Sequence, residues 1–135
     1  MGKGGAFGEP VVVKPGAIVY ALLRDMATAI KIVKCAAQFG LVARNFDKAE
    51  AVIESARSKK PFLIILDFEH CEAEAYKTLK EFQKNADLKS VPFVGFVTKS
   101  REAVKGEAER AGCDRVYMKT EFDRELPNLM TRYAK

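Results

Sequence analysis

The sequence predicts a single open α/β domain in which helices cover both faces of a parallel sheet. Five apolar segments with the length of strands alternate along the chain with five segments whose apolar residues recur at helical spacing. The strand segments are apolar at nearly every position, as expected of strands buried on both faces, and right-handed crossovers place helices over those faces. A length of 135 residues suits one such domain.

The first strand and helix are predicted in residues 17–40. The apolar run AIVYALL (17–23) predicts a buried strand, and the helix that follows ends at Gly40. One face of this helix collects apolar side chains, and we expect it to pack against the sheet. The residues on this face are Met26, Ile30, Val33 and Ala37.

The second strand and helix are predicted in residues 41–58. LVARNF (41–46) indicates a short strand, and residues 47–58 indicate a helix. Asp47 and Glu50 stand at the spacing of a capping box, which would satisfy the amide groups at the helix start. The apolar face of this helix consists of Ala49, Val52, Ile53 and Ala56.

The third and fourth units repeat the pattern. FLIIL (62–66) and PFVGFVT (92–98) predict strands, and residues 74–86 predict the helix between them. The fourth helix, residues 100–111, is expected to be weak because Gly106 interrupts it and its apolar face is small. The third helix presents Ala75, Leu79, Phe82 and Ala86, and the fourth presents Val104, Ala108 and Ala111.

The last unit consists of a strand over DRVYMK (114–119) and a terminal helix. We expect Pro127 to lie near the start of this helix, where the N–H that proline lacks is not needed. The apolar face of the helix consists of Leu126, Leu129, Met130 and Tyr133.

The N-terminal residues 1–15 are expected to form a flexible arm before a domain in residues 16–135. The stretch PVVVK (10–14) is expected to be loose, because prolines bracket it. The arm has no apolar region typical of a secretion signal, and no apolar run in the chain approaches the length of a membrane span. We therefore expect a cytoplasmic protein with no membrane partner.

Cysteine usage and charge exclude some functions. Cys35, Cys71 and Cys113 show no CxxC spacing, so neither a disulfide framework nor a zinc knuckle is expected. The net charge is +5, but the lysines and arginines are scattered among carboxylates without a basic stripe. Nucleic acid is therefore an unlikely partner.

Polar residues stand at the ends of several predicted strands. Asp67 ends the third strand, Arg24 and Asp25 follow the first, Thr98 ends the fourth and Lys119 ends the fifth. The carboxyl ends of parallel strands meet at one edge, where open α/β sheets bind their ligands. These carboxylates, the hydroxyl and the ammonium group are therefore expected to converge on one crevice.

With these residues, the chain from residue 17 to residue 133 resembles the receiver domain of two-component response regulators, in an atypical variant. The resemblance implies a flavodoxin-like (βα)5 doubly wound sandwich with the strand order 2-1-3-4-5. It also implies that Asp67 is the phosphoacceptor, Thr98 the switch hydroxyl and Lys119 a contact of the phosphoryl group.

The resemblance further implies a cofactor and partners. Mg²⁺, held by Asp25, Asp67 and the backbone carbonyl of Glu69, would neutralise the phosphoryl oxygens. A stand-alone receiver, which is not classed as an enzyme, would accept its phosphoryl group from a sensor histidine kinase or a phosphotransfer protein. It would then signal by binding a downstream protein target.

The sequence also departs from the receiver pattern. Arg24 stands where receivers usually have a second acidic residue, and we expect its guanidinium to lie near Asp25 or Asp67 and to weaken Mg²⁺ binding. The loop after Asp67 lacks the usual proline and glycine. Thr120 stands where a proline is usual, and Val116 replaces a common aromatic residue.

Three functions therefore remain. The favoured one is a receiver phosphorylated on Asp67, and the alternative is a phosphorylation-independent pseudo-receiver that acts as a protein-interaction module. A small nucleotide- or flavin-binding enzyme is disfavoured, because no glycine-rich phosphate loop follows the first strand.

One candidate metal ligand also has a simpler explanation, and a zinc site is not expected. Asp25 can serve as the N-cap of the first helix without binding a metal. His70 and Cys71 are adjacent, so they would chelate one ion poorly, and the chain has no other histidine to complete a zinc site.

Overall fold

The computed structural model describes residues 13–135. Most of the predicted arm (1–15) and of the stretch 10–14 therefore lies outside the described residues. The described chain enters the domain through a turn at Pro15 and Gly16, where Gly16 has a φ of 77° and the N–H of Ala17 bonds to the carbonyl of Lys14 at 3.1 Å. Glycine tolerates this left-handed conformation, which a type II turn requires.

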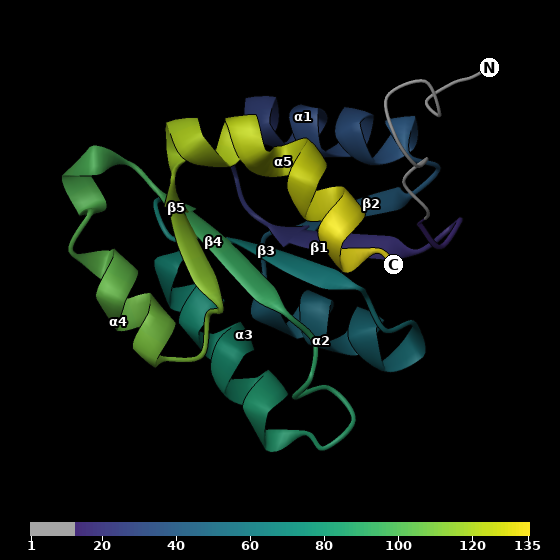
Figure 1. The fold of residues 1–135 in the computed structure, drawn as a ribbon. Helices are drawn as coiled ribbons and strands as arrows, with labels where there is room; N and C mark the ends of the chain where they lie inside the picture. The colour runs from purple at the N-terminus through teal and green to yellow at the C-terminus, as the bar shows by residue number, and fades with distance from the viewer. Residues whose placement is uncertain (1–12) are drawn as a thin grey trace.

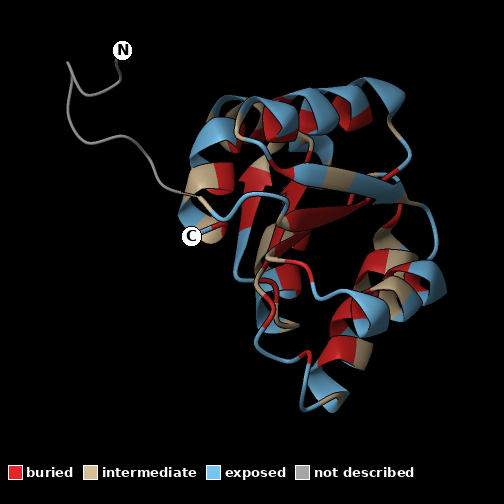
Figure 2. Cartoon of the chain, turned by 90° about the vertical axis from the view of Figure 1, so that its right-hand side faces the viewer, coloured by how far each residue is buried: buried red, intermediate tan, exposed pale blue. Residues whose placement is uncertain are grey.

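The sheet consists of five strands: β1 Ile18–Leu22, β2 Val42–Phe46, β3 Leu63–Asp67, β4 Phe93–Val97 and β5 Arg115–Met118. All neighbouring strands are parallel, and their order is β2-β1-β3-β4-β5 (Figure 1), which confirms the prediction. Every residue of β1, β3 and β4 is buried, whereas the edge strand β2 is exposed or half-buried throughout (Figure 2).

Five helices cover the sheet: α1 Met26–Gln38, α2 Ala49–Ser58, α3 Glu72–Lys84, α4 Val104–Arg110 and α5 Lys119–Tyr133. A 3₁₀ turn, η2 Lys99–Arg101, precedes α4. Helices α1 and α5 pack on one face of the sheet, and α2, α3 and α4 pack on the other (Figure 1). None of the helices within residues 13–135 is long and apolar enough to cross a membrane.

The predicted buried face of α1 is wrong. Met26, Ile30 and Val33 are 72%, 47% and 43% exposed, and Ala37 is also exposed. The helix carries a second apolar stripe with smaller residues, which lets the helix axis approach the sheet closely and bury more of its surface. The side chains that face the sheet are those of Thr28, Ala29, Ile32, Cys35 and Ala36.

The capping box predicted for Asp47 and Glu50 is also wrong. The N-cap of α2 is Lys48, and no side chain of the same segment caps the helix. Glu74 of α3 accepts the N–H of Ala49 at 2.7 Å instead. A carboxylate from a neighbouring helix therefore satisfies the start of α2, which local spacing does not reveal. The predicted apolar faces of α2, α3 and α4 are confirmed, except that Ala86 lies beyond α3 and is exposed.

The position predicted for Pro127 is wrong as well. β5 ends at Met118 and Lys119 begins α5, so Pro127 lies about two turns inside the helix. Proline removes the bond to the carbonyl four residues before it, at a cost of about 3 kcal/mol. Pro127 faces solvent, where water can reach that carbonyl, and the buried side chains of Phe122, Leu126, Leu129 and Met130 offset the loss.

A close contact fixes the chain as it leaves β3. Phe68, which directly follows Asp67, is fully buried and packs its ring against Gly95 of β4. A Cβ atom at Gly95 would lie 2.5 Å from Cε2 of Phe68, so this contact requires glycine. The position of Asp67 therefore depends on the packing between β3 and β4.

Candidate functional site

The residues predicted as a site occupy the carboxyl edge of the sheet. Asp67 is the last residue of β3, and Thr98 directly follows β4. Arg24 and Asp25 lie in the loop between β1 and α1, and Lys119 is the first residue of α5. The parallel sheet thus places all five at the same edge, although each side chain makes its own local contacts.

Asp67 is completely buried and engaged by its own loop. Its Oδ1 accepts the N–H groups of Glu69 and His70 at 2.8 and 2.9 Å. Its Oδ2 lies 3.1 Å from Nδ1 of His70, whose side chain is 54% exposed. The imidazole therefore stands between the Asp67 carboxylate and solvent.

Asp25 is the N-cap of α1, as the simpler explanation predicted. Its side chain accepts the N–H of Ala27 at 3.2 Å and the hydroxyl of Thr28 at 2.5 Å. The hydrogen bond from Thr28 is the largest cause of a pKa of Asp25 below its ordinary value. The positive charge of Lys119 contributes to lowering the pKa of Asp25. Both oxygens of Asp25 are thus used in starting the helix.

Arg24 directly precedes Asp25 in the loop between β1 and α1. The two residues and His70 line a pocket of about 130 Å³. Within residues 13–135, Arg24 forms no ion pair shorter than 4.0 Å with Asp25 or Asp67. The positive charge of Arg24 therefore lies at the entrance of the site without an ion pair to either carboxylate.

Thr98 is held by the side chain of Glu69. The Glu69 carboxylate accepts the Thr98 hydroxyl at 2.7 Å and the Thr98 N–H at 3.3 Å. The hydroxyl of Ser100 lies 2.9 Å from that of Thr98. The hydrogen bond from the Thr98 side chain is the main cause that lowers the pKa of Glu69. The Thr98 hydroxyl therefore already donates its hydrogen bond to a negative group of the chain itself.

Lys119 is bound to Asp123 within α5. Its Nζ lies 2.8 and 2.9 Å from the two carboxylate oxygens and 5.8 Å from the ring centroid of Phe96. Lys31 of α1 reaches the same carboxylate at 3.2 Å. Asp123 thus pairs with two ammonium groups, and it lies one helical turn after Lys119 in α5.

The sequence did not reveal these partners. Only the spacing of Lys119 and Asp123, four residues apart on a helix, was a usable signal. The expectation for Glu69 concerned its backbone carbonyl, and that for His70 concerned zinc. Glu69 reaches the end of the neighbouring strand and His70 turns back onto Asp67, and both contacts depend on the conformation of the loop, which the sequence alone did not determine.

Solved structures share this fold. The receiver domain of the sensor histidine kinase PA1611 from Pseudomonas aeruginosa, solved with a coordinated magnesium ion, has a TM-score of 0.73 and 15% identity, covering 88% of this chain and 98% of that one. The chemotaxis response regulator CheY4 of Vibrio cholerae has a TM-score of 0.72 and 15% identity, covering 87% and 98%. The Mn²⁺-bound form of the response regulator Rcp1 has a TM-score of 0.70 and 14% identity, covering 88% and 95%.

No protein-family model matches the chain, and no curated protein matches it in sequence. The likeness in structure nevertheless extends over nearly all of the described residues and includes the strand order. The chain therefore has the fold of response-regulator receiver domains.

Proposed function

We propose that the chain is a signalling module of receiver fold that acts by binding a protein partner and keeps Asp67 unphosphorylated. One observation carries this proposal: Asp67 is fully buried, and its oxygens are engaged by two backbone N–H groups and by His70. A carboxylate that attacks phosphorus needs a free oxygen facing solvent. Here the imidazole would have to leave first.

The contacts of the neighbouring groups support the same proposal. The Thr98 hydroxyl is held by Glu69, and the Lys119 ammonium group is held by Asp123. In a phosphorylated receiver these two groups would bind phosphoryl oxygens, which the resemblance implies. Each of these two groups is already bound to a carboxylate of the chain. Thr98 can therefore keep its position without a phosphoryl group on Asp67.

Mg²⁺ would bind weakly at this site. Asp25 uses both oxygens at the start of α1, and Asp67 shares its outer oxygen with His70. In the described part of the chain, no three His, Cys, Asp or Glu side chains gather as a metal site. The charge of Arg24 adds a repulsion of about 1 kcal/mol, which weakens binding several-fold. The donors Asp25, Asp67 and the Glu69 carbonyl therefore do not fit a tightly held ion.

A second candidate is a receiver phosphorylated on Asp67. It is favoured by the position of Asp67, which ends a central strand at the same edge of the sheet as Thr98 and the start of α5. In this case an oxygen of Asp67 forms a bond to phosphorus, and the bond between phosphorus and the donor breaks with its electron pair on the leaving group. A sensor histidine kinase or a phosphotransfer protein would be the donor, after rotation of His70.

Intact mass after incubation with Mg²⁺ and acetyl phosphate distinguishes the two candidates. We expect the wild-type mass to stay unchanged. The double variant His70→Ala/Arg24→Asp should gain one phosphoryl group, because its Asp67 is accessible and an acidic residue replaces the cation. Adding Asp67→Asn to this variant should abolish the gain.

A phosphoryl group on the wild type that Asp67→Asn removes would instead establish the second candidate. Titration with Mg²⁺ tests the role of Arg24 separately. Arg24→Asp should bind Mg²⁺ several-fold more tightly than the wild type. The control Arg57→Asp makes the same charge change on α2, away from the site, and should change the affinity much less. Equal affinities for wild type and Arg24→Asp would show that Arg24 does not control metal binding.

A further inference from the structure

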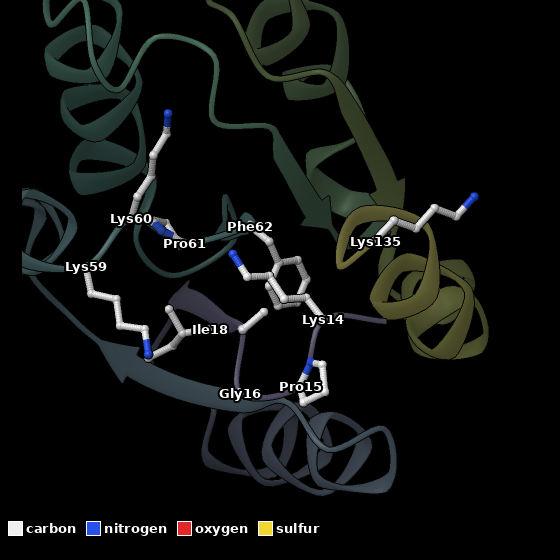
Figure 3. Close-up of a pocket in the computed structure, with 10 residues that line it drawn as sticks. Lys14, Pro15, Gly16, Ile18, Lys59, Lys60, Pro61, Phe62 and Lys135 are labelled. Carbon is white, nitrogen blue, oxygen red and sulfur yellow. The ribbon is translucent and has the colours of Figure 1, made fainter. Parts of the chain in front are cut away.

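A basic pocket lies at the opposite edge of the sheet from Asp67. It is formed by residues 14–18, 59–62 and Lys135, and we call it the lysine pocket (Figure 3). Its volume is about 390 Å³, which is within the range of small-molecule sites. It lies at the amino ends of β1 and β3, so the length of β3, about 15 Å, separates it from the Asp67 site.

The lysine pocket is strongly positive. Four of its residues are lysines, Lys14, Lys59, Lys60 and Lys135, and none of its lining residues has an acidic side chain. Within residues 13–135, none of these lysines takes part in an ion pair. Figure 3 shows Lys14 and Lys59 along two sides of the pocket, while Lys60 and Lys135 extend away from its rim. Each lysine carries its ammonium group on a flexible four-carbon stem, so the groups at the rim can change direction.

The backbone that carries these lysines is fixed without a ligand. The N–H of Lys14 bonds to the carbonyl of Ala134 at 2.8 Å. The carbonyl of Lys59 accepts the hydroxyl of Tyr20, a fully buried residue of β1, at 2.6 Å. The N–H of Phe62 bonds to the carbonyl of Ile18 at 2.9 Å. Binding of an anion would therefore have the entropic cost of ordering side chains but not that of ordering loops.

One wall of the lysine pocket is apolar. The ring of Phe62 is half-buried and lines the pocket, as does Lys14 (Figure 3). Ile18 and Pro61 are buried beneath it. A purely ionic ligand would make no use of this wall, whereas the flat base of a nucleotide can stack on an aromatic ring.

We propose that the lysine pocket binds a nucleoside polyphosphate. Lys14 and Lys59 hold the phosphate chain, Lys60 and Lys135 turn in from the rim, and the base lies against Phe62. Lysines are suited to this role as point charges for phosphate, even though no glycine-rich loop is present. The binding needs neither Mg²⁺ nor a change at Asp67, so it does not depend on the function proposed for that edge.

Calorimetric titrations in EDTA at fixed ionic strength test this proposal, with ATP, tripolyphosphate and adenosine as the probes. We expect ATP to bind more tightly than tripolyphosphate, and adenosine to show no binding, because both the phosphates and the base contribute. Amide chemical-shift changes on adding ATP should concentrate in residues 14–18, 59–62 and Lys135. Shifts that concentrate at the Asp67 edge, or no binding of ATP, would overturn the proposal.

Variants separate the two parts of the ligand. Lys14→Gln/Lys59→Gln should weaken ATP binding by about tenfold or more. The control Lys80→Gln removes an exposed lysine of α3 that lies outside the pocket, and it should change the affinity by less than about twofold. Phe62→Leu keeps an apolar side chain and should reduce the affinity for ATP to that for tripolyphosphate. If Lys80→Gln lost as much affinity for ATP as the double variant, net charge alone would explain the effect. If Phe62→Leu still preferred ATP over tripolyphosphate, the base would not stack on Phe62. Either result contradicts the proposed site. Far-UV circular dichroism verifies that each variant is folded.

Discussion

Glu69 is the residue that most distinguishes the carboxyl edge of this sheet. Its carboxylate accepts two hydrogen bonds from Thr98, one from the hydroxyl and one from the backbone. Both bonds are stronger when the carboxylate is charged, which explains why the pKa of Glu69 is lowered. The position of Thr98 should therefore depend on the ionisation of a residue two positions after Asp67.

Replacing Glu69 by Gln tests this dependence through stability. Since the folded-state pKa of Glu69 lies below its unfolded value, the stabilisation is present above the unfolded pKa and is lost as the pH falls through the folded pKa. We expect Glu69→Gln to lower the free energy of unfolding at neutral pH by less than about 1 kcal/mol, because the side chain is partly exposed. Urea unfolding from about pH 6 to about pH 3 should show this difference shrinking on acidification.

The control for this experiment is Thr98→Val, which removes the hydroxyl and keeps the shape of the side chain. In the Thr98→Val background, Glu69→Gln should cost less than in the wild type, because the side-chain bond is already lost. A pH-independent difference between wild type and Glu69→Gln would contradict the stabilising role of the charged carboxylate.

Residue types at strand ends were predictable from the sequence, but their contacts were not. Asp67, Thr98 and Lys119 could be assigned to one edge because parallel strands end together. The spacing of Lys119 and Asp123 indicated one contact, but the contact between Glu69 and Thr98 could not be predicted, because a long carboxylate side chain can reach several donors and its choice depends on rotamer and loop geometry. The topology thus determined at which edge of the sheet a polar side chain lies, and local contacts determined its hydrogen-bond partners.

At the scale of elements, α1 is the clearest case of an ambiguous pattern. It has two apolar stripes, and the structure buries the one with Ile32 while Ile30 remains 47% exposed. Helical periodicity identified the helix correctly because both stripes have the same period. It could not decide which stripe faces the sheet, because that depends on how closely the helix can approach, and small residues such as Ala29 and Ala36 favour close packing.

Matched alanine substitutions in α1 test the buried face. Ile32→Ala should lower the free energy of unfolding by about 2–5 kcal/mol, because Ile32 is fully buried and a cavity would remain. Ile30→Ala removes the same atoms from an exposed position and should cost less than about 1 kcal/mol. Urea unfolding measures both. Equal costs, or a larger cost at Ile30, would mean that the originally predicted face is the one that packs.

The fourth helix is shorter than the predicted segment 100–111. The small apolar face of Val104, Ala108 and Ala111 indicated a weak helix, and the structure has only the short α4 preceded by the 3₁₀ turn η2. Few large apolar groups anchor this segment. It directly follows Thr98, so the contact between Thr98 and Glu69 lies next to a segment with few buried side chains.

Across the whole molecule, stability should be graded from the centre of the sheet to its edges. β3 lies between β1 and β4, and all residues of these three strands are buried between the two helical layers. β2 bonds to a neighbour on one side only and is exposed or half-buried. The alternating strand and helix patterns predicted a parallel sheet, and the resemblance to receiver domains implied the strand order and therefore which strands are central.

Native-state hydrogen exchange measures this gradation directly. We expect hydrogen-bonded amides of β1, β3 and β4 to exchange only through global unfolding, because opening any of them would expose both core layers. Amides of β2 and α4 should exchange through local opening at lower free energies. Urea at sub-denaturing concentrations should accelerate exchange in the first group strongly and in the second group weakly, because exchange of the second group exposes little surface.

Asp67 belongs to the slow group and Thr98 borders the fast one, so the contact of Thr98 with Glu69 joins a rigid strand end to a segment that opens easily. Equal protection of α4 and β3 would contradict this gradation, and the receiver-fold module would then have no soft element next to Thr98.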